Sequence, residues 1–412
     1  MKILLYEHVS GGGFAGDALP PSLLSEGFAM LRGLAADFKV ARHEVTVLLD
    51  SRLADFSPPV AADHFVWVSE LGSASQSIAN VAESVDAVFV VAPEANQTLQ
   101  KLVDQVEVSG QLSLNSKPTA IAKAADKASL LTRLNGLGLK APKTVTFGLQ
   151  DPLEIIELAI REEMDFPCVF KPLNGAGCSG TSIVRSEAEI GSAVDKINAD
   201  PAGSIMVQEF IEGSPASVSL IAADSKALPV SLNLQDITLA SPDEVSSYNG
   251  GLVPFDHPLK EAAFAAAKRI VESFGGLRGY VGVDVILGDG GVVVVEVNPR
   301  LTTSYVGLRR VADFNVAESI LGSSYKGVLP EVTHPIGVSC FSKVPVSRPV
   351  VFAWQDFLRM EDLASPPFPM ANEETCYGML QSYGDTVQNA LRNLGEAKKR
   401  LHEIWQRGLN PW

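Results

Sequence analysis

Short apolar runs rich in β-branched residues recur through the first quarter of the chain, separated by segments typical of helices. Such runs predict strands. The predicted strands are residues 2–6, 44–49, 65–68 and 87–91, and the predicted helices are 21–34 and 94–106. Strands that alternate with helices over this length indicate an α/β domain with an open, mostly parallel sheet, whose ligands bind beyond the carboxyl ends of the strands.

A glycine-rich loop, residues 7–13, follows the first predicted strand and therefore lies at such a carboxyl end. Its glycines would let backbone amides approach a ligand, but no GxGxxG pattern follows, so dinucleotide binding is not indicated. A flexible connection is the alternative interpretation. If the loop contacts a substrate, we expect the side chains of Glu7 and Ser10 to do so.

A lysine stands directly before a second glycine-rich loop, in a unit of the chain that begins near residue 116. Lys171 ends an apolar strand, and residues 174–181 then form the loop. A lysine in this position can place its ammonium group over a phosphate, while the loop donates backbone N–H groups and the hydroxyls of Ser179 and Thr181. No Gly-Lys-Ser/Thr closes the loop, so it is not a P-loop. An ordinary glycine turn is the alternative.

A strand beginning at residue 205 ends in Glu209-Phe210-Ile211-Glu212. Backbone groups of Phe210 and Ile211 could form hydrogen bonds with the edge of a planar ring. The carboxylate of Glu209 could accept a hydrogen bond from an exocyclic amine, and that of Glu212 could bind ribose hydroxyls. The alternative is an ordinary strand exit with solvated carboxylates.

Two strongly apolar runs, residues 279–287 and 292–297, are joined by Gly-Asp-Gly-Gly and predict a β-hairpin. Side chains of a strand alternate between faces, so Glu296 and Asn298 emerge on the same face. Pairing across the turn brings Asp284 opposite position 295 or 296, depending on the register. Three polar side chains are therefore expected on one small patch of an apolar hairpin.

The chemistry of this patch indicates a metal site. Two buried carboxylates side by side are unfavourable without a cation between them, and oxygen ligands suit a hard ion such as Mg²⁺ that holds phosphate oxygens. Arg300 follows the second strand as a candidate anion clamp. A strand with one solvent-exposed face is the alternative, but residues 292–295 show no polar alternation.

The order of these features resembles the ATP-grasp superfamily over about residues 116–320. The features are Asp-Lys before a helix, strand-Lys-Pro before a glycine loop, Gln-Glu-Phe-Ile-Glu-Gly, and Asp followed by Glu-x-Asn-Pro-Arg. The resemblance implies an ATP-grasp module preceded by the superfamily's usual amino-terminal α/β domain. It also implies that ATP binds with Mg²⁺, or with Mn²⁺ in its place.

The resemblance carries over to single residues. Lys127 and Lys171 would bind nucleotide phosphates, and Glu209 to Glu212 would hold adenosine. Arg300 and Lys171 would act in catalysis, with Arg300 steadying the transferring phosphoryl group. The mobile phosphate lid would contain Gly175, Gly177, Ser179, Gly180 and Thr181, and the metal ligands would be Asp284, Glu296 and Asn298.

The reaction that the superfamily implies is carboxylate activation. A substrate carboxylate attacks the γ-phosphate of ATP, and an amine captures the acylphosphate to give an amide, ADP and phosphate. Stabilisation of such a transition state is mostly positioning and electrostatics, which fits the absence of a Ser-His-Asp set from the sequence. Glu7 could deprotonate the amine, but the sequence does not place a base.

Within the superfamily, three segments are similar to the tyramine–glutamate ligase group of furan-cofactor biosynthesis: residues 6–12, 25–31 and 91–94. This resemblance implies that the γ-carboxylate of L-glutamate is joined to the amine of tyramine, as in methanofuran or methylofuran synthesis. The open alternatives are another amino acid and amine pair, a carboxylase-type protein that activates bicarbonate, and a regulatory ATP-binding protein. The carboxylase alternative is weakened because no Met-Lys-Met biotin-carrier segment occurs.

For the acceptor end of the site, the segment after Arg300 is the best candidate. Thr303 and Ser304 could form hydrogen bonds with a substrate carboxylate, and Tyr305 could stack on a ring. Alternatively, these residues cap a helix that contains residues 308–312.

A chain of 412 residues exceeds what one core usually supports. We expect an amino-terminal domain (1–115), an ATP-grasp module (116–330, with a lid at about 142–213) and a carboxyl-terminal extension (331–412) packed on it. The extension reads as a strand or two at 338–346, a proline-rich connection at 365–369 and a helix at 386–406. Lys398, Lys399 and Arg400 are interpreted as a solvated face of that helix.

Composition narrows the classes of partner that the protein is expected to bind. A net charge of −15 argues against a nucleic-acid surface, and no apolar run reaches membrane-spanning length. Small-molecule substrates remain, and a homodimer is left open. The four cysteines form no metal-type pair and indicate reduced thiols in a cytoplasmic protein, with Cys178 a small residue that fits its loop or, alternatively, a reactive thiol. The histidines show no zinc spacing.

Overall fold

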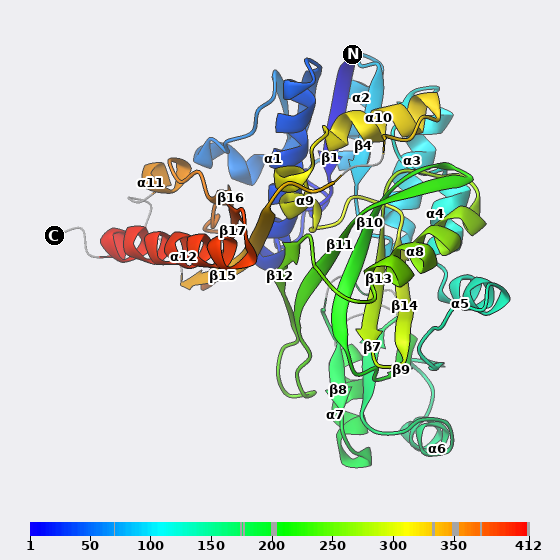
Figure 1. Ribbon diagram of the computed structural model, residues 1–412. Coiled ribbons are helices and arrows are strands. Elements are labelled where there is room, and N and C mark those ends of the chain that lie inside the picture. Colours follow the sequence, from blue (N-terminus) through cyan, green and yellow to red (C-terminus); the bar gives the residue numbers. More distant parts are fainter. Residues whose placement is uncertain are drawn as a thin grey trace.

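The computed structural model describes residues 1–69, 71–173, 175, 178–198, 204–331, 334–347, 354–370 and 373–409. These residues form three sheets: a five-stranded sheet, a four-stranded sheet and an eight-stranded sheet (Figure 1). Mixed α/β architecture is confirmed, since helices cover the parallel sheet and line the larger antiparallel one.

The amino-terminal sheet is entirely parallel, as predicted, with the strand order β3-β2-β1-β4-β5. Its carboxyl edge carries the glycine-rich loop after β1 and the segment after β4. The elements are β1 (Lys2–Glu7), α1 (Pro21–Val40), β2 (Glu44–Asp50), β3 (His64–Val68), α2 (Ala74–Ala82), β4 (Ala87–Val91), α3 (Thr98–Val108) and β5 (Leu112–Ser113).

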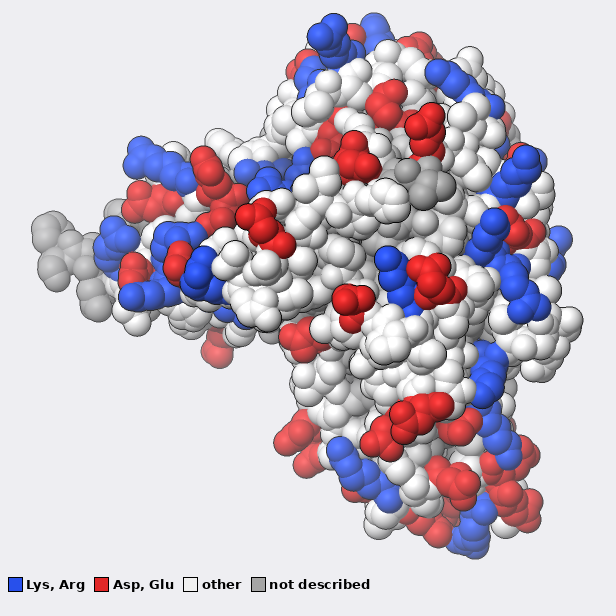
Figure 2. Space-filling view, in the orientation of Figure 1, with Lys and Arg blue, Asp and Glu red and all other residues white. Residues whose placement is uncertain are grey.

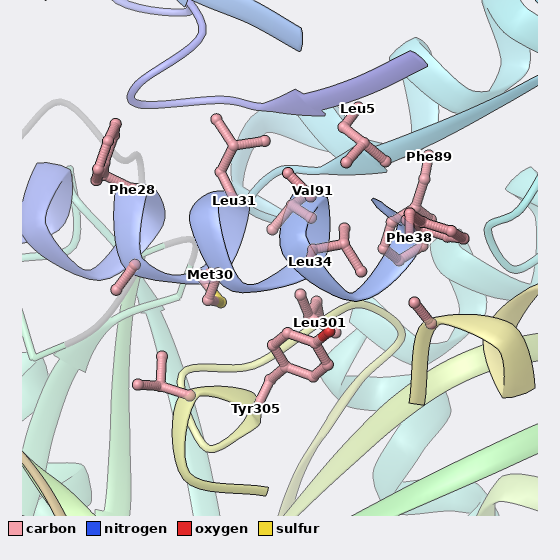
Figure 3. Close-up of a cluster of buried hydrophobic side chains, with 14 of the residues drawn as sticks. Leu5, Phe28, Met30, Leu31, Leu34, Phe38, Phe89, Val91, Leu301 and Tyr305 are labelled. Atoms are coloured by element: carbon pink, nitrogen blue, oxygen red, sulfur yellow. The ribbon is translucent and has the colours of Figure 1, made fainter. Parts of the chain in front are cut away.

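Helix α1 connects this domain to the rest of the molecule through one hydrophobic core. Phe28, Leu31, Leu34 and Phe38 recur at helical spacing and are fully buried. Figure 3 shows them beside Leu5, Phe89 and Val91 of the parallel sheet, with Leu301 and Tyr305 approaching from the other side of the helix. Burial of each such side chain contributes about 1.5–3 kcal/mol, so the amino-terminal domain and the following module are held together firmly.

A separate four-stranded antiparallel sheet, with the order β6-β9-β7-β8, lies inside the range expected for the lid. It has its own core, which includes Ile156, Phe170 and Ile205, and it forms the lower end of the molecule in Figure 1. The elements are β6 (Thr144–Gly148), α6 (Leu153–Glu163), β7 (Cys168–Pro172), β8 (Ser182–Val184), α7 (Ile190–Asn198) and β9 (Ser204–Glu209).

The central sheet has the order β14-β13-β10-β11-β12-β15-β17-β16. Helix α8, which the sequence did not predict, packs on one face of it through Ala263, Ile270 and Phe274. The elements up to residue 330 are α4 (Pro118–Ala125), α5 (Lys127–Gly136), β10 (Ser214–Asp224), β11 (Lys226–Thr238), β12 (Ser247–Val253), α8 (Lys260–Phe274), β13 (Leu277–Gly288), β14 (Gly291–Asn298), α9 (Tyr305–Val311) and α10 (Val316–Lys326).

The carboxyl-terminal segment continues this same sheet. Strand β15 pairs with β12, and β17, which was not predicted, pairs with β15. The last helix, α12, covers both through buried residues such as Leu394 and Leu401 and projects to the left in Figure 1. The elements are β15 (Val338–Ser347), α11 (Trp354–Leu358), β16 (Leu363–Ser365), β17 (Thr375–Gly384) and α12 (Val387–Leu409).

Acidic and basic side chains are interspersed on the face shown in Figure 2, with broad uncharged areas between them. None of the helices in the described part of the chain combines the length and the apolar character needed to cross a bilayer.

Candidate active site

The β13–β14 hairpin brings the predicted metal-binding side chains together. A two-residue turn, Asp289-Gly290, lets Gly288 pair with Gly291, and the register places Asp284 opposite Glu296. A β-bulge between Asp284 and Val285 makes Val295 the extra residue, because Val285 pairs with Val294. Of the two registers that the sequence allowed, the structure therefore has the one that sets the carboxylates against each other.

Amide groups surround the Asp284 carboxylate. Asn298 Nδ2 donates to Asp284 Oδ2 at 2.9 Å, and Gln235 Nε2 donates to Asp284 Oδ1 at 3.1 Å. Gln235 lies on β11 and was missed by the sequence analysis, because only the strand order of the folded sheet reveals its position. Burial, together with the adjacent charge of Glu296, raises the pKa of Asp284 to about 6.

Glu296 is in the opposite electrostatic situation. Burial alone would raise its pKa, but the charges of Lys127 and Lys171 lower it to about 2. Lys127 Nζ forms an ion pair with Glu296 Oε1. Lys127 is placed by a helix start: the Asp126 carboxylate caps α5 by accepting from Ser129 N at 2.6 Å, so Lys127 is the first residue of the helix.

The donor set fits a hard divalent cation. Two carboxylates and an amide are adjacent, and in the described ranges no group of three or more His, Cys, Asp or Glu residues could hold a metal ion without other ligands. Mg²⁺ is usually held by one or two carboxylates together with phosphate oxygens of a substrate, which is what this open arrangement provides. The Lys127 ammonium beside Glu296 supplies positive charge at the same place.

Arg300 bridges the hairpin and the amino-terminal domain. Its Nε donates to Glu94 Oε2 at 2.9 Å, and its Nη2 lies 3.5 Å from Asn298 Oδ1. Glu94 follows β4 at the carboxyl edge of the parallel sheet, and its Oε1 is buried without a hydrogen-bond partner in the described part of the structure. The sequence analysis assigned Glu94 no role, although its position directly after a buried strand was a usable signal.

The glycine loop lies between the lid strands β7 and β8. A Cβ atom at Gly180 would lie 2.7 Å from Pro172, and its φ of +68° also favours glycine. Thr181 is buried and its carbonyl accepts from Ser246 Oγ at 2.8 Å, whereas Ser179 is exposed. Gly175 is exposed, and Gly177 lies outside the described residues. Burial lowers the pKa of Lys171, which enters the site from the end of β7.

The predicted adenosine-binding segment joins the lid to the central sheet. Glu209 is fixed at the end of β9, since its N–H donates to Lys143 O at 2.9 Å. Phe210 and Ile211 are half-buried and Glu212 is exposed. The backbone at Glu212 lies against the turn end of the hairpin, at Gly288. A ligand between the lid sheet and the hairpin would therefore meet this segment.

The side chains of Glu7 and Ser10 form hydrogen bonds inside the loop, and their contact with a substrate stays a prediction. The Glu7 carboxylate accepts from Val9 N at 3.1 Å, Ser10 N at 2.8 Å and Ser10 Oγ at 2.7 Å. Both side chains are buried. Burial raises the pKa of Glu7, and these hydrogen bonds oppose the shift. Together they fix the shape of the loop.

Of the predicted acceptor residues, Thr303 is half-buried, whereas Ser304 and Tyr305 are buried. Thr303 Oγ1 donates to Glu26 Oε2 at 3.2 Å. Ser304 is buried against Ser217 Oγ at 3.1 Å and makes no side-chain cap for α9. The ring of Tyr305 is fully buried against α1 (Figure 3), and its hydroxyl donates to Asp37, so no face of the ring is exposed in this structure.

The sequence analysis gave Glu26 no role, although the sequence marks it as a carboxylate within an otherwise apolar helix segment. It forms an ion pair with Lys343 at 2.6 Å. The thiol of Cys178, in the glycine loop, is not activated, since burial and the charge of Glu26 raise its pKa to about 11. A small residue that fits the loop is therefore the better interpretation of Cys178.

The comparisons with known proteins agree with this geometry. The ATP-grasp domain family matches residues 124–304, and the pre-ATP-grasp 3 domain family matches residues 43–121. A tyramine–L-glutamate ligase from Methanocaldococcus jannaschii is 30% identical over 227 residues, which cover 55% of this chain and 59% of that protein. One from Methanocaldococcus fervens is 28% identical over 314 residues, covering 74% of this chain and 89% of that protein.

Among solved structures, an ATP-grasp superfamily protein from Archaeoglobus fulgidus matches with a TM-score of 0.61 and 25% identity, covering 92% of this chain and 99% of that one. Biotin carboxylase from Campylobacter jejuni, solved with an ATP analogue, has a TM-score of 0.71 at 14% identity over 97% and 91% of the two chains. The second likeness shows the fold alone. The two matched domains coincide with the domain order and the site described above, and the chain spans 59% of the length of the first of these ligases. Residues 124–304 match an ATP-grasp domain that follows a pre-ATP-grasp domain, and the chain resembles ATP-grasp superfamily proteins in sequence and in fold.

Proposed function

We propose that this protein is an ATP-dependent carboxylate–amine ligase, and that it joins the γ-carboxylate of L-glutamate to the amine of tyramine. The observation that carries the reaction class is the meeting of Asp284, Glu296 and Asn298 on one patch of the hairpin, with Lys127 and Arg300 beside them. The choice of glutamate and tyramine rests on the two ligases of that name, which are 30% and 28% identical to this chain.

Positive charge lines the route of the phosphoryl group. Lys171 enters from the lid and Lys127 from the start of α5, and both act on Glu296. Transfer of a phosphoryl group spreads negative charge over its oxygens, so two ammonium groups aimed at one region lower the energy of that state. These lysines would hold the phosphates of ATP in line with the attacking carboxylate.

Asp284, Glu296 and Asn298 would hold Mg²⁺, whose charge, when bound, would neutralise phosphate oxygens. Arg300 would steady the acylphosphate, because its guanidinium is held by Glu94 on one side and lies near Asn298 on the other. A guanidinium fixed in this way loses little freedom when it binds an anion.

The reaction then has two balanced steps. The substrate carboxylate attacks the γ-phosphorus of ATP, and the bond to the bridging oxygen of ADP breaks. The neutral amine attacks the acyl carbon, the carbon–oxygen bond to phosphate breaks, and a proton leaves the nitrogen. No covalent bond to the protein forms in either step.

ADP release tests this proposal. The protein is mixed with Mg-ATP, L-glutamate and a panel of amines that contains tyramine, and ADP and the amide are measured separately. ADP formation that requires both an acid and an amine supports a ligase, and the largest kcat/KM with glutamate and tyramine supports the substrates. ATP binding without turnover for any pair would instead favour a regulatory protein.

A further inference from the structure

A buried ion pair joins two parts of the chain that are 317 residues apart. Lys343 Nζ, on β15, donates to Glu26 Oε1 at 2.6 Å and to Ser22 Oγ at 2.6 Å, both on α1. The side chains of Lys343 and Glu26 are 7% and 15% exposed. Neither residue belongs to the hairpin or to the lid, and the reaction described above uses neither.

Two further contacts connect this pair to the reacting end of the site. Thr303 Oγ1 donates to Glu26 Oε2 at 3.2 Å, and Thr303 stands three residues after Arg300 on the loop that leaves the hairpin. Cys178, in the lid loop, lies within electrostatic range of Glu26, Lys343 and Asp284. The pair is therefore linked by a hydrogen bond to the loop that carries Arg300.

The half-buried Tyr248, on β12, is a second residue on which the charges of both the ion pair and the hairpin act. It lies within electrostatic range of both Glu26 and Asp284. The Tyr377 ring, on β17, lies 5.8 Å from Lys343 Nζ. Aromatic and charged groups from α1, β12, β15 and β17 are thus associated with this ion pair.

We propose that Glu26 and Lys343 are the recognition site for the zwitterionic head group of an amino-acid substrate, with Glu26 binding the α-ammonium and Lys343 binding the α-carboxylate. This inference rests on the proposed function and deepens it. The distal carboxylate of the same substrate then extends toward Arg300 and the hairpin.

Exchange of ion pairs is the physical basis for this recognition. In a region of low dielectric constant, an ion pair that opens leaves two buried charges, each of which is costly without a partner. A zwitterion supplies one partner of the correct sign to each. A ligand without an ammonium leaves Glu26 unpaired, and a ligand without the α-carboxylate leaves Lys343 unpaired, so the pair selects for the complete head group.

A second ion pair on the same helix provides the matched control. Asp37 and Arg309 are 14% and 18% exposed, close to the values for Glu26 and Lys343. Asp37 also accepts from the hydroxyl of Tyr305 within the hydrophobic core, so this pair holds α1 against α9. Removal of its charge should lower stability without altering the choice of substrate.

The test uses three acids that share the distal carboxylate: L-glutamate, glutarate, which lacks the α-ammonium, and 4-aminobutyrate, which lacks the α-carboxylate. Hydroxylamine serves as the amine, because it captures an acylphosphate whatever the natural amine is. We expect wild-type kcat/KM to be at least about thirtyfold higher with glutamate than with either analogue, since one unpaired buried charge costs about 2 kcal/mol or more.

Each variant should change the preference in its own direction. Glu26→Gln should lower kcat/KM for glutamate about thirtyfold and leave or raise that for glutarate, whereas Lys343→Gln should lower it for glutamate and leave it for 4-aminobutyrate. The double variant Glu26→Gln/Lys343→Gln leaves no unpaired charge in the fold and should lose the preference for glutamate over both analogues. Asp37→Asn should lower the melting temperature and keep the wild-type ranking.

Two outcomes would overturn the inference. Variants that lower kcat/KM equally for all three acids would show a structural role, and variants that retain the wild-type ranking would show no role in recognition. Absence of ADP from wild-type protein with every acid would contradict the proposed function instead. Calorimetric titration of L-glutamate into the protein with Mg-ADP then decides separately: binding that the double variant abolishes supports the head-group site, and absence of binding to the wild type contradicts it.

Discussion

The proposed metal-binding end of the site comes from a single hairpin, whereas the proposed substrate end is assembled from α1, the loop after β14 and β15. Asp284, Glu296 and Asn298 are positioned by the pairing of adjacent strands. Glu26, Thr303 and Lys343 meet only because distant parts of the chain share one core and one sheet. If both proposals hold, the residues for phosphoryl transfer are grouped by local strand pairing, while the residues that select the substrate are grouped by tertiary packing.

The largest effect on turnover should follow from a substitution in the β13–β14 hairpin. Asp284→Asn removes one of the proposed ligands of Mg²⁺, so we expect turnover to fall by a factor of about 10² to 10³ or more, because the metal charge that stabilises the phosphoryl group is held less well. The fold should stay intact, since relief of paired negative charges is not destabilising. ADP release and a thermal unfolding curve measure the two quantities. Turnover near the wild-type rate would refute the metal assignment.

The next effect concerns the ion pair that ties the hairpin to the amino-terminal domain. Glu94→Gln keeps a hydrogen-bond acceptor for Arg300 but removes the charge, and we expect kcat to fall about tenfold to a hundredfold with little change in KM for ATP. Glu107→Gln is the control, because Glu107 pairs with Arg278 at 2.6 Å and also joins this domain to the central sheet. Equal losses in both variants would mean that Glu94 only holds the domains together.

A smaller effect is expected at the lid. Lys171→Ala removes one charge-assisted contact to phosphate, so the Kd for Mg-ATP should rise about tenfold to a hundredfold. Lys143→Ala, at a side chain that is 53% exposed, should leave the Kd unchanged. Isothermal titration calorimetry measures both, and an unchanged Kd in the first variant would argue against a phosphate-binding lid.

The grouping of residues on the hairpin could be predicted from the sequence for a physical reason. Apolar alternation and a two-residue turn fix which side chains of a hairpin share a face, so Asp284, Glu296 and Asn298 could be grouped from the order of residues alone. The same holds for the parallel amino-terminal sheet. The bulge at Val295 could not be predicted, because it depends on how the hairpin meets its neighbours, and it decides between the two registers.

The substrate end of the site could not be predicted from the sequence, for the complementary reason. Tyr305 follows the catalytic loop in the sequence, but only the packing of α1 over it shows that its ring belongs to the core. Glu7 and Ser10 were correctly placed at a strand end, but the hydrogen bond between their side chains could not be foreseen. Glu26 and Lys343 carry no motif, and β17 and α8 were not predicted because nothing in the local pattern marked them.

The Tyr305→Phe variant tests whether Tyr305 is a residue of the hydrophobic core or contacts a substrate. Loss of the hydrogen bond to the Asp37 carboxylate should lower the free energy of unfolding by about 1.5–3 kcal/mol, while KM for both substrates stays unchanged. Chemical denaturation and steady-state kinetics measure these quantities. A raised KM with unchanged stability would return Tyr305 to the substrate site.

The smallest effect at neutral pH concerns His8, in the loop that Glu7 shapes. Burial lowers the pKa of His8 to about 4, below its ordinary value of about 6.5. The neutral ring is therefore favoured by folding, and its contribution, at most about 3 kcal/mol, is complete above pH 6.5 and is lost as the pH falls toward 4. NMR titration should find the His8 ring neutral at pH 6, and His8→Gln should flatten this part of the stability profile. A ring that titrates near 6.5 would contradict the buried loop.

A crystal of the protein with Mn²⁺ and a non-hydrolysable ATP analogue tests the central claim most directly, because manganese is located by its anomalous scattering. The account predicts a manganese peak coordinated by Asp284 and Glu296, with the γ-phosphate of the analogue on the same ion and Lys171 over the phosphates. A peak at another place, or a nucleotide bound away from the hairpin, would contradict it.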